Sequence, residues 1–149
     1  MTRRRATFAL LLAAWVLAGP VSPAGGGEAS GIASITFCSK VGKSSGKAYG
    51  EARSFVLEEG RRVHARVEFD GLRPREERIL HLLWTDPDGR RVFRKRVVLM
   101  PEEPRAWVTT NLSLSPERRE PGTYRLRVFL YRMLVADGTV ELTAQLPQD

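Results

Sequence analysis

An alternation of apolar and polar residues with a period of two constrains this chain more than any other feature. Between positions 62 and 69, every odd position is apolar and every even position is polar. Successive side chains of a β-strand point to opposite faces, so this pattern predicts an antiparallel strand with one buried face. The same period returns between positions 122 and 131, where Tyr124, Leu126, Val128 and Leu130 alternate with Arg125, Arg127, Phe129 and Tyr131.

Other short segments also have the residue types of strands. Residues 79–84 are apolar almost throughout, which is typical of a central strand, and Asp86-Pro87-Asp88-Gly89 behind them predicts a tight turn. Residues 41–50 are rich in glycine, serine and lysine and predict a loop, and Asp137-Gly138 predicts a bulge in the last strand. No segment favours an amphipathic helix. We therefore predict an all-β sandwich of about seven antiparallel strands, with further strands at 32–38, 91–100, 107–114 and 134–144.

The N-terminal 24 residues differ from the rest of the chain. Arginines at positions 3–5 precede an uncharged apolar run at 6–18, and small or helix-breaking residues follow up to Ala24. This order predicts a secretory signal peptide over residues 1–24, cleaved after Ala24. An uncleaved anchor is the alternative, although the 13-residue apolar run is shorter than the roughly 20 residues that cross a bilayer. We expect a flexible glycine-rich lead-in at 25–31, one domain at 32–146, and a periplasmic or secreted protein without a membrane span.

The charge balance and the cysteine content narrow the class of protein further. The full chain has 24 basic and 17 acidic residues, and loss of the three N-terminal arginines leaves 21 against 17, a net charge of +4. This mild excess does not favour nucleic-acid binding. Cys38 is the only cysteine, so an intramolecular disulfide is excluded. We expect Cys38 to be half-buried beside Ser34 and Thr36, with an intermolecular disulfide as the alternative.

Three motifs follow one another in the order of a known architecture. They are Phe55-x4-Gly60-x2-Val63, Trp84-x-Asp86-Pro87-Asp88-Gly89 and Pro121-Gly122-Thr123-Tyr124-Arg125-Leu126. With them the chain resembles small immunoglobulin-like β-sandwich accessory domains of bacterial exported proteins, of macroglobulin- or fibronectin-III-like architecture. The resemblance implies that Trp84 packs in the core and that the Tyr124 hydroxyl bonds an upstream backbone group in a tyrosine corner. It also implies structural roles for Gly89 and Gly122, and Leu126 in place of a cysteine favours the disulfide-free relatives.

The residue types needed for catalysis are sparse. A nucleophile needs a base within hydrogen-bond reach, but Cys38 has only His64 and His81 as candidate bases, and we expect both histidines to face solvent away from it. One thiol and two isolated histidines do not form a zinc pattern. The paired glutamates fall in predicted loops rather than at the fixed separation that a glycosidase needs. We therefore expect no enzyme activity, no metal and no cofactor.

One predicted surface has the composition of a binding site. In a sandwich, the outward side chains of the last two strands share a face with those of the third and fourth strands. We expect this face to hold Arg125, Arg127, Phe129, Tyr131, His81, Arg94 and Arg96, with Lys95 as the alternative if the register slips. Arginine with aromatic residues is enriched at the centres of protein interfaces. We predict a non-enzymatic module that binds an envelope protein, and the alternative is a binder of anionic glycan or polysaccharide.

Overall fold

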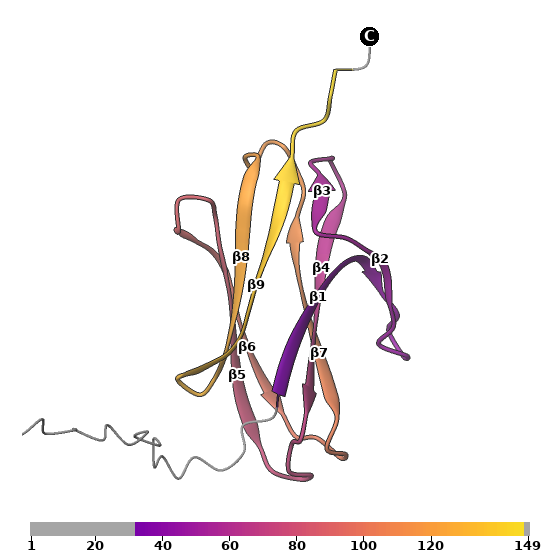
Figure 1. Ribbon diagram of the computed structural model, residues 1–149, viewed down its shortest axis with the longest axis vertical. Coiled ribbons are helices and arrows are strands. Elements are labelled where there is room, and N and C mark those ends of the chain that lie inside the picture. Colours follow the sequence, from indigo (N-terminus) through magenta and orange to yellow (C-terminus); the bar gives the residue numbers. More distant parts are fainter. Residues whose placement is uncertain (1–31, 148–149) are drawn as a thin grey trace, which may run out of the picture.

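The computed structural model describes residues 32–147, and these form two β-sheets packed face to face (Figure 1). The predicted signal peptide (1–24), its uncleaved alternative and the predicted lead-in (25–31) lie outside the described residues. No helix in the described part of the chain is long and apolar enough to span a membrane. Nine strands make up the sheets: β1 (Ile32–Val41), β2 (Ala48–Glu51), β3 (Ser54–Val56), β4 (Arg62–Asp70), β5 (Arg78–Thr85), β6 (Arg91–Leu99), β7 (Ala106–Ser113), β8 (Gly122–Leu130) and β9 (Met133–Thr143).

The strand order explains why the chain makes a sandwich. One sheet has four strands in the order β2-β1-β4-β7, and the other has five in the order β3-β9-β8-β5-β6. All neighbours are antiparallel except β3, which runs parallel to β9. The prediction of an all-β sandwich is confirmed, while the expected number of about seven strands is too small, because β2 and β3 are short and lack a two-residue period.

The segment predicted to be a loop, residues 41–50, is largely a β-hairpin. The first strand continues to Val41, and β2 returns beside it after a turn closed by a 2.8 Å hydrogen bond from Gly42 N to Lys47 O. The turn folds back over the outer side of the four-stranded sheet (Figure 1), where Gly46 meets the indole of Trp107. A Cβ on Gly46 would lie 2.2 Å from Cε2 of that indole, so only glycine allows this approach.

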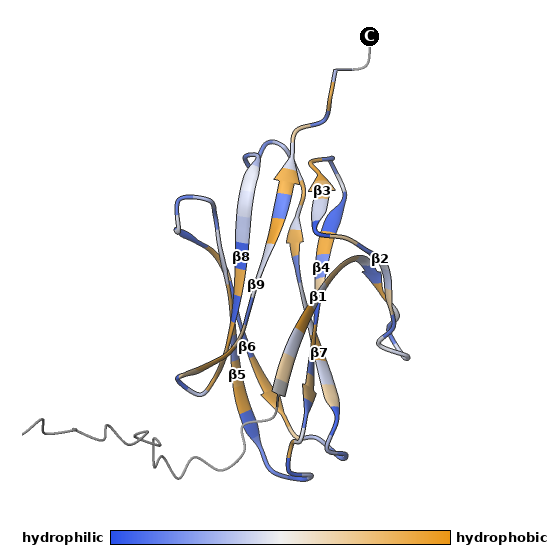
Figure 2. Ribbon diagram, in the orientation of Figure 1, coloured by the Kyte–Doolittle hydropathy of each residue, from blue (hydrophilic) through white to orange (hydrophobic). Residues whose placement is uncertain are grey.

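The core between the sheets is centred on a fully buried tryptophan, Trp84 of β5. Its indole N–H donates to Thr110 Oγ1 of β7 at 3.2 Å, and its ring lies 5.8 Å from the ring of Phe37 on β1. Leucine and valine from both sheets fill the remaining space. Figure 2 shows apolar and polar residues alternating along the strands, as the period of two requires. No disulfide contributes, because Cys38 is a free thiol.

The bulge in the last strand is not at Asp137-Gly138, as the sequence suggested. Both residues pair regularly with β8, and the register shifts instead near Val135, between the pairs of Val128 and Phe129. Gly138 has a different role. A Cβ there would lie 3.1 Å from a ring carbon of Phe37, so the glycine lets that ring pack directly against the β9 backbone.

The implied tyrosine corner is present at the start of β8. Tyr124 is buried, and its hydroxyl donates to Glu120 O at 3.0 Å and accepts from Glu120 N at 3.2 Å. Gly122, at φ +142°, leaves room for Pro87, and Gly89, at φ +79°, completes the turn between β5 and β6 with a 2.9 Å bond from its N–H to Asp86 O. These contacts tie the loop before β8 to the end of β5.

Tyr124→Phe is expected to lower the free energy of unfolding by about 1 kcal/mol, because the two backbone groups of Glu120 lose a buried partner. Urea denaturation followed by tryptophan fluorescence measures the change. Tyr131→Phe is the matched control, since its hydroxyl also bonds a backbone carbonyl but the residue is 49% exposed and water replaces the bond. Equal losses in the two variants would contradict a special role for the corner.

Candidate functional site

The outer face of the five-stranded sheet brings most of the predicted binding residues together. Residues on β8, β5 and β6 that lie opposite one another form three cross-strand rows on this face. The rows are Phe129–His81–Arg96, Arg127–Leu83–Arg94 and Arg125–Thr85–Arg91.

The alternative placement of Lys95 on this face is wrong. Lys95 lies opposite Leu82, whose side chain is fully buried between the sheets. From this inner row the Lys95 ammonium reaches past the core and donates to Thr109 O of β7 at 2.9 Å. The register therefore places Arg94 and Arg96 on the outer face, as first expected.

A trough of about 480 Å³ runs along β5 on this face. Its floor has side chains of moderate size, Leu83 and Thr85, whereas longer side chains stand on both neighbouring strands. This difference in length creates the hollow. The trough is lined by His81, Leu83, Thr85, Gly89, Arg91, Arg94, Arg127, Phe129 and Tyr131.

Two predicted site residues lie on the face but not in the trough. Arg96 stands at the outer end of its row on the edge strand β6. Arg125 is held by Asp137 of β9, with its Nε donating to Oδ1 at 2.7 Å and its Nη2 to Oδ2. The hydrogen bonds from Arg125 lower the pKa of Asp137 below its ordinary value, and the nearby Arg127 charge adds to the effect. The hydrogen bonds of Asp137 thus go to Arg125, while Arg127 acts on it only through its charge.

Three guanidinium groups in the trough form no salt bridge in the described part of the chain. Arg91, Arg94 and Arg127 make no ion pair within residues 32–147, and the Nε of Arg127 is buried without a hydrogen-bond partner. Arg94 Nη2 lies 3.2 Å from His81 Nδ1; because a guanidinium only donates, Nδ1 is the acceptor. Arg127 is half-buried and Arg91 and Arg94 are exposed. Guanidinium groups without an ion pair favour a bound anion, which would satisfy their remaining donors.

The other end of the same face is apolar. Phe129 is half-buried, while Val98 of β6 and Leu134 of β9 are 50% and 48% exposed. The alternation predicted Tyr131 to be part of the strand, but it lies in the turn after β8 at φ +55°. Its hydroxyl donates to Glu77 O at 3.0 Å, which holds the ring at the end of the trough.

Sequence reasoning missed Arg91, Leu83, Thr85 and Gly89 as residues of the trough. Arg91 could not be predicted because the β5–β6 register shifts between Trp84 and Thr85, and no residue pattern indicates this shift. The shift places Arg91 opposite Thr85. Leu83 and Thr85 were hidden because an apolar central strand does not reveal which of its residues face outward. The prediction that Trp84 is buried could have identified these two residues, because the neighbours of an inward-facing residue in a strand face outward.

The cysteine differs from its predicted setting. Cys38 is fully buried, not half-buried, because the β1–β2 hairpin folds over its face. His64 lies directly opposite it on β4, contrary to the expectation that neither histidine would be near. Burial raises the pKa of the Cys38 thiol and lowers the pKa of His64, so both groups favour their neutral forms. A buried neutral thiol is a poor nucleophile, and no bond joins it to His64.

No group of three or more metal-ligating side chains occurs among residues 32–147. The described chain therefore offers no cluster that would hold a metal ion. The trough combines guanidinium donors with apolar groups, and its lining residues include neither a carboxylate nor a thiol.

Comparison with known proteins identifies the fold. No family model matches the chain, and no curated protein matches it either. Among solved structures, an immunoglobulin-like protein from Pseudomonas aeruginosa is 23% identical with a TM-score of 0.51, over 74% of this chain and 92% of that one. The chain is thus an immunoglobulin-like β-sandwich.

Two weaker likenesses involve parts of larger enzymes. An alkylpurine DNA glycosylase from Pseudomonas fluorescens is 13% identical with a TM-score of 0.45, over 60% of this chain and 27% of that one. A β-glucosidase from Listeria innocua is 15% identical with a TM-score of 0.40, over 76% of this chain and 16% of that one. Neither likeness is close enough to bear on function.

The native Cys38 thiol is expected to resist a water-soluble thiol reagent and to react fully once the protein is unfolded in urea, because the side chain has no exposed surface. Quantitative labelling followed by intact mass spectrometry measures this. A Ser44→Cys, Cys38→Ala variant, with its thiol in the exposed turn, is the control that should label at once. Rapid labelling of native Cys38, or a covalent dimer on a non-reducing gel, would contradict the burial.

Proposed function

We propose that this protein is a non-enzymatic exported binding module that contacts a protein partner through the outer face of its five-stranded sheet. The observation that carries the proposal is the trough along β5, where Arg91, Arg94 and Arg127 form no ion pair with the described residues. Arginine beside aromatic and aliphatic side chains is the composition of interface centres. Export rests on the predicted signal peptide at residues 1–24.

The division of the face into two ends supports a protein partner over a uniform polyanion. The arginine end suits a carboxylate, which guanidinium groups bind in a bidentate manner. The apolar end, with Val98, Phe129 and Leu134, gains from burial against apolar side chains. A protein surface that carries acidic and apolar residues side by side satisfies both ends at once.

An anionic glycan is the second candidate, and the three unpaired guanidinium groups favour it. Aromatic residues at the end of the trough, Phe129 and Tyr131, suit the apolar face of a sugar ring. The two candidates differ in their salt dependence. Binding of a polyanion weakens steeply as ionic strength rises, whereas a contact that buries apolar surface does not.

Site-specific photo-crosslinking in living cells tests the proposal. A photoreactive residue replaces Val98 on the proposed face, or Ser34 on the outer face of the other sheet as a control. The account predicts a discrete protein adduct from position 98 and none from position 34. Arg94→Gln with Arg127→Gln should reduce that adduct about tenfold or more, the loss of roughly 1.4 kcal/mol or more of binding free energy.

The matched control for charge is Arg105→Gln with Arg118→Gln, which removes two positive charges from exposed positions elsewhere. This control should leave the adduct unchanged. Equal adducts from both faces, or an adduct that survives loss of Arg94 and Arg127, would refute the proposed site. Retention of polysaccharide on the immobilised protein at low salt only would favour the glycan candidate instead.

A further inference from the structure

The edge of β9 is only partly covered. β3 pairs with Glu141, Leu142 and Thr143 alone, whereas β9 begins at Met133. Glu141 N donates to Arg53 O, so the main-chain groups of odd-numbered residues in this part of β9 point away from β8. By the alternation of an antiparallel ladder, the N–H and C=O groups of Asp137 and Thr139 point the same way. On the side of β9 away from β8, no strand of the described chain pairs with Asp137 or Thr139.

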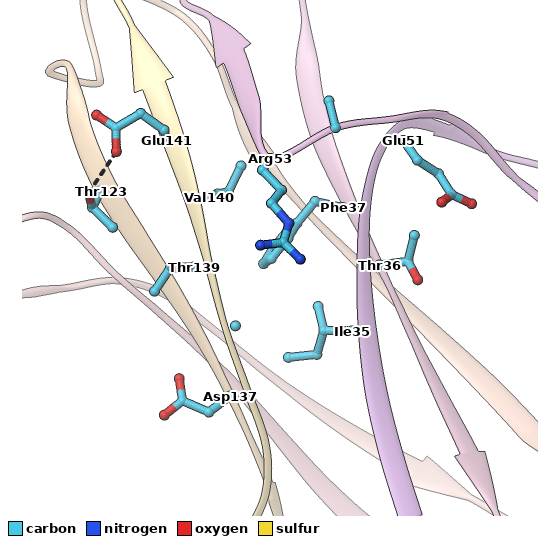
Figure 3. A pocket seen from close by; sticks show the side chains of 12 residues that line it. Ile35, Thr36, Phe37, Glu51, Arg53, Thr123, Asp137, Thr139, Val140 and Glu141 are labelled. Carbon is cyan, nitrogen blue, oxygen red and sulfur yellow. Dashed lines mark hydrogen bonds between the residues drawn. The ribbon is translucent and has the colours of Figure 1, made fainter.

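A cleft of about 740 Å³ lies along this uncovered edge, between β9 and β1 (Figure 3). One wall is residues 137–141 of β9, and the other is residues 35–37 of β1. Ile35 and Phe37 pack against Gly138, which closes the base of the cleft with apolar atoms. The cleft therefore combines free main-chain donors and acceptors with an apolar base.

One cation points into the cleft without a partner. Figure 3 shows the guanidinium of Arg53 between the two strands. Arg53 makes no ion pair within the described residues. Of the three carboxylates that line the cleft, Asp137 binds Arg125 and Glu141 accepts a 2.7 Å bond from Thr123, while Glu51 makes no ion pair with Arg53. The cleft thus offers a site for an acid at the end where β3 begins.

We infer that the uncovered edge of β9 binds an extended polypeptide segment of a partner protein by strand addition. The segment continues the line of β3 and bonds the main-chain groups of Asp137 and Thr139. Its alternate apolar side chains face Ile35 and Phe37, and an acidic residue meets Arg53. Main-chain hydrogen bonds give affinity in such additions, and side-chain pockets give specificity.

A free strand edge normally carries a device that prevents such pairing, for example a lysine, a proline or a covering loop. The other sheet shows one, because Lys95 caps Thr109 O on the edge strand β7. The stretch of β9 from Asp137 to Thr139 has no lysine or proline, and the β2–β3 connection covers only the end at Arg53. Pairing with a second copy of β9 is less favourable, because each edge is recessed beside its own β1.

Amide hydrogen exchange by NMR on the full chain tests the inference. The probe is an eight-residue peptide with valine at every second position, serine and threonine between them, and one terminal glutamate. Without peptide, the Asp137 and Thr139 amides should exchange freely. With millimolar peptide, both should gain about tenfold or more protection, while amides along β5 under the trough remain unchanged. Failure here leaves the β5 trough untouched, so the two proposals fail separately.

Two variants and one control peptide sharpen the test. Arg53→Gln should weaken binding of the glutamate peptide about three- to fivefold and leave a matched glutamine peptide unaffected. Thr139→Pro removes one outward N–H and should abolish protection at Asp137, with the melting temperature as the check on folding. No protection by peptide, or protection confined to β5, would overturn the inference. Protection that rises with protein concentration alone would also overturn it, because a second copy would then occupy the edge.

Discussion

The contact of Trp84 with the opposite sheet is the interaction on which the rest of the structure depends. Its indole packs against Phe37 and donates a hydrogen bond to Thr110, so one side chain of β5 engages both β1 and β7. Antibody-type domains secure the same place with a disulfide, but here the single cysteine lies on an outer face. Without a disulfide, the two sheets are held by side-chain packing and by hydrogen bonds such as that of Trp84, and close approaches such as that of Phe37 to Gly138 make this packing dense.

The two outer faces of the sandwich differ in how far other parts of the chain cover them. The β1–β2 hairpin folds over the four-stranded sheet, where it buries Cys38 and seats Gly46 on Trp107. Within residues 32–147, no hairpin covers the trough of the five-stranded sheet, which is lined by arginines and apolar side chains. The hairpin thus covers part of one outer face, whereas the trough on the other face stays accessible. This difference supports the proposed binding face.

The sequence carried the alternation that defines the main strands, and it therefore placed His81, Arg94 and Arg127 on one face correctly. It did not carry the features that depend on contacts between distant residues. The β1–β2 hairpin depends on Gly46 meeting Trp107, and the trough depends on a register shift after Trp84 that brings in Arg91. The burial of Cys38 follows from the hairpin, and the uncovered edge of β9 follows from the shortness of β3. These are tertiary facts, and no period in the sequence encodes them.

The central claim is that the core holds the fold while the arginines of the trough are free to bind. Equilibrium urea unfolding of the unmodified protein, of Trp84→Ala and of Arg94→Gln with Arg127→Gln tests this separation directly. The account predicts that loss of Trp84 costs about 3–5 kcal/mol or prevents folding. It predicts that the arginine substitutions change stability by no more than about 0.5 kcal/mol each. A large loss of stability in the arginine variant, or a small one in Trp84→Ala, would contradict the account.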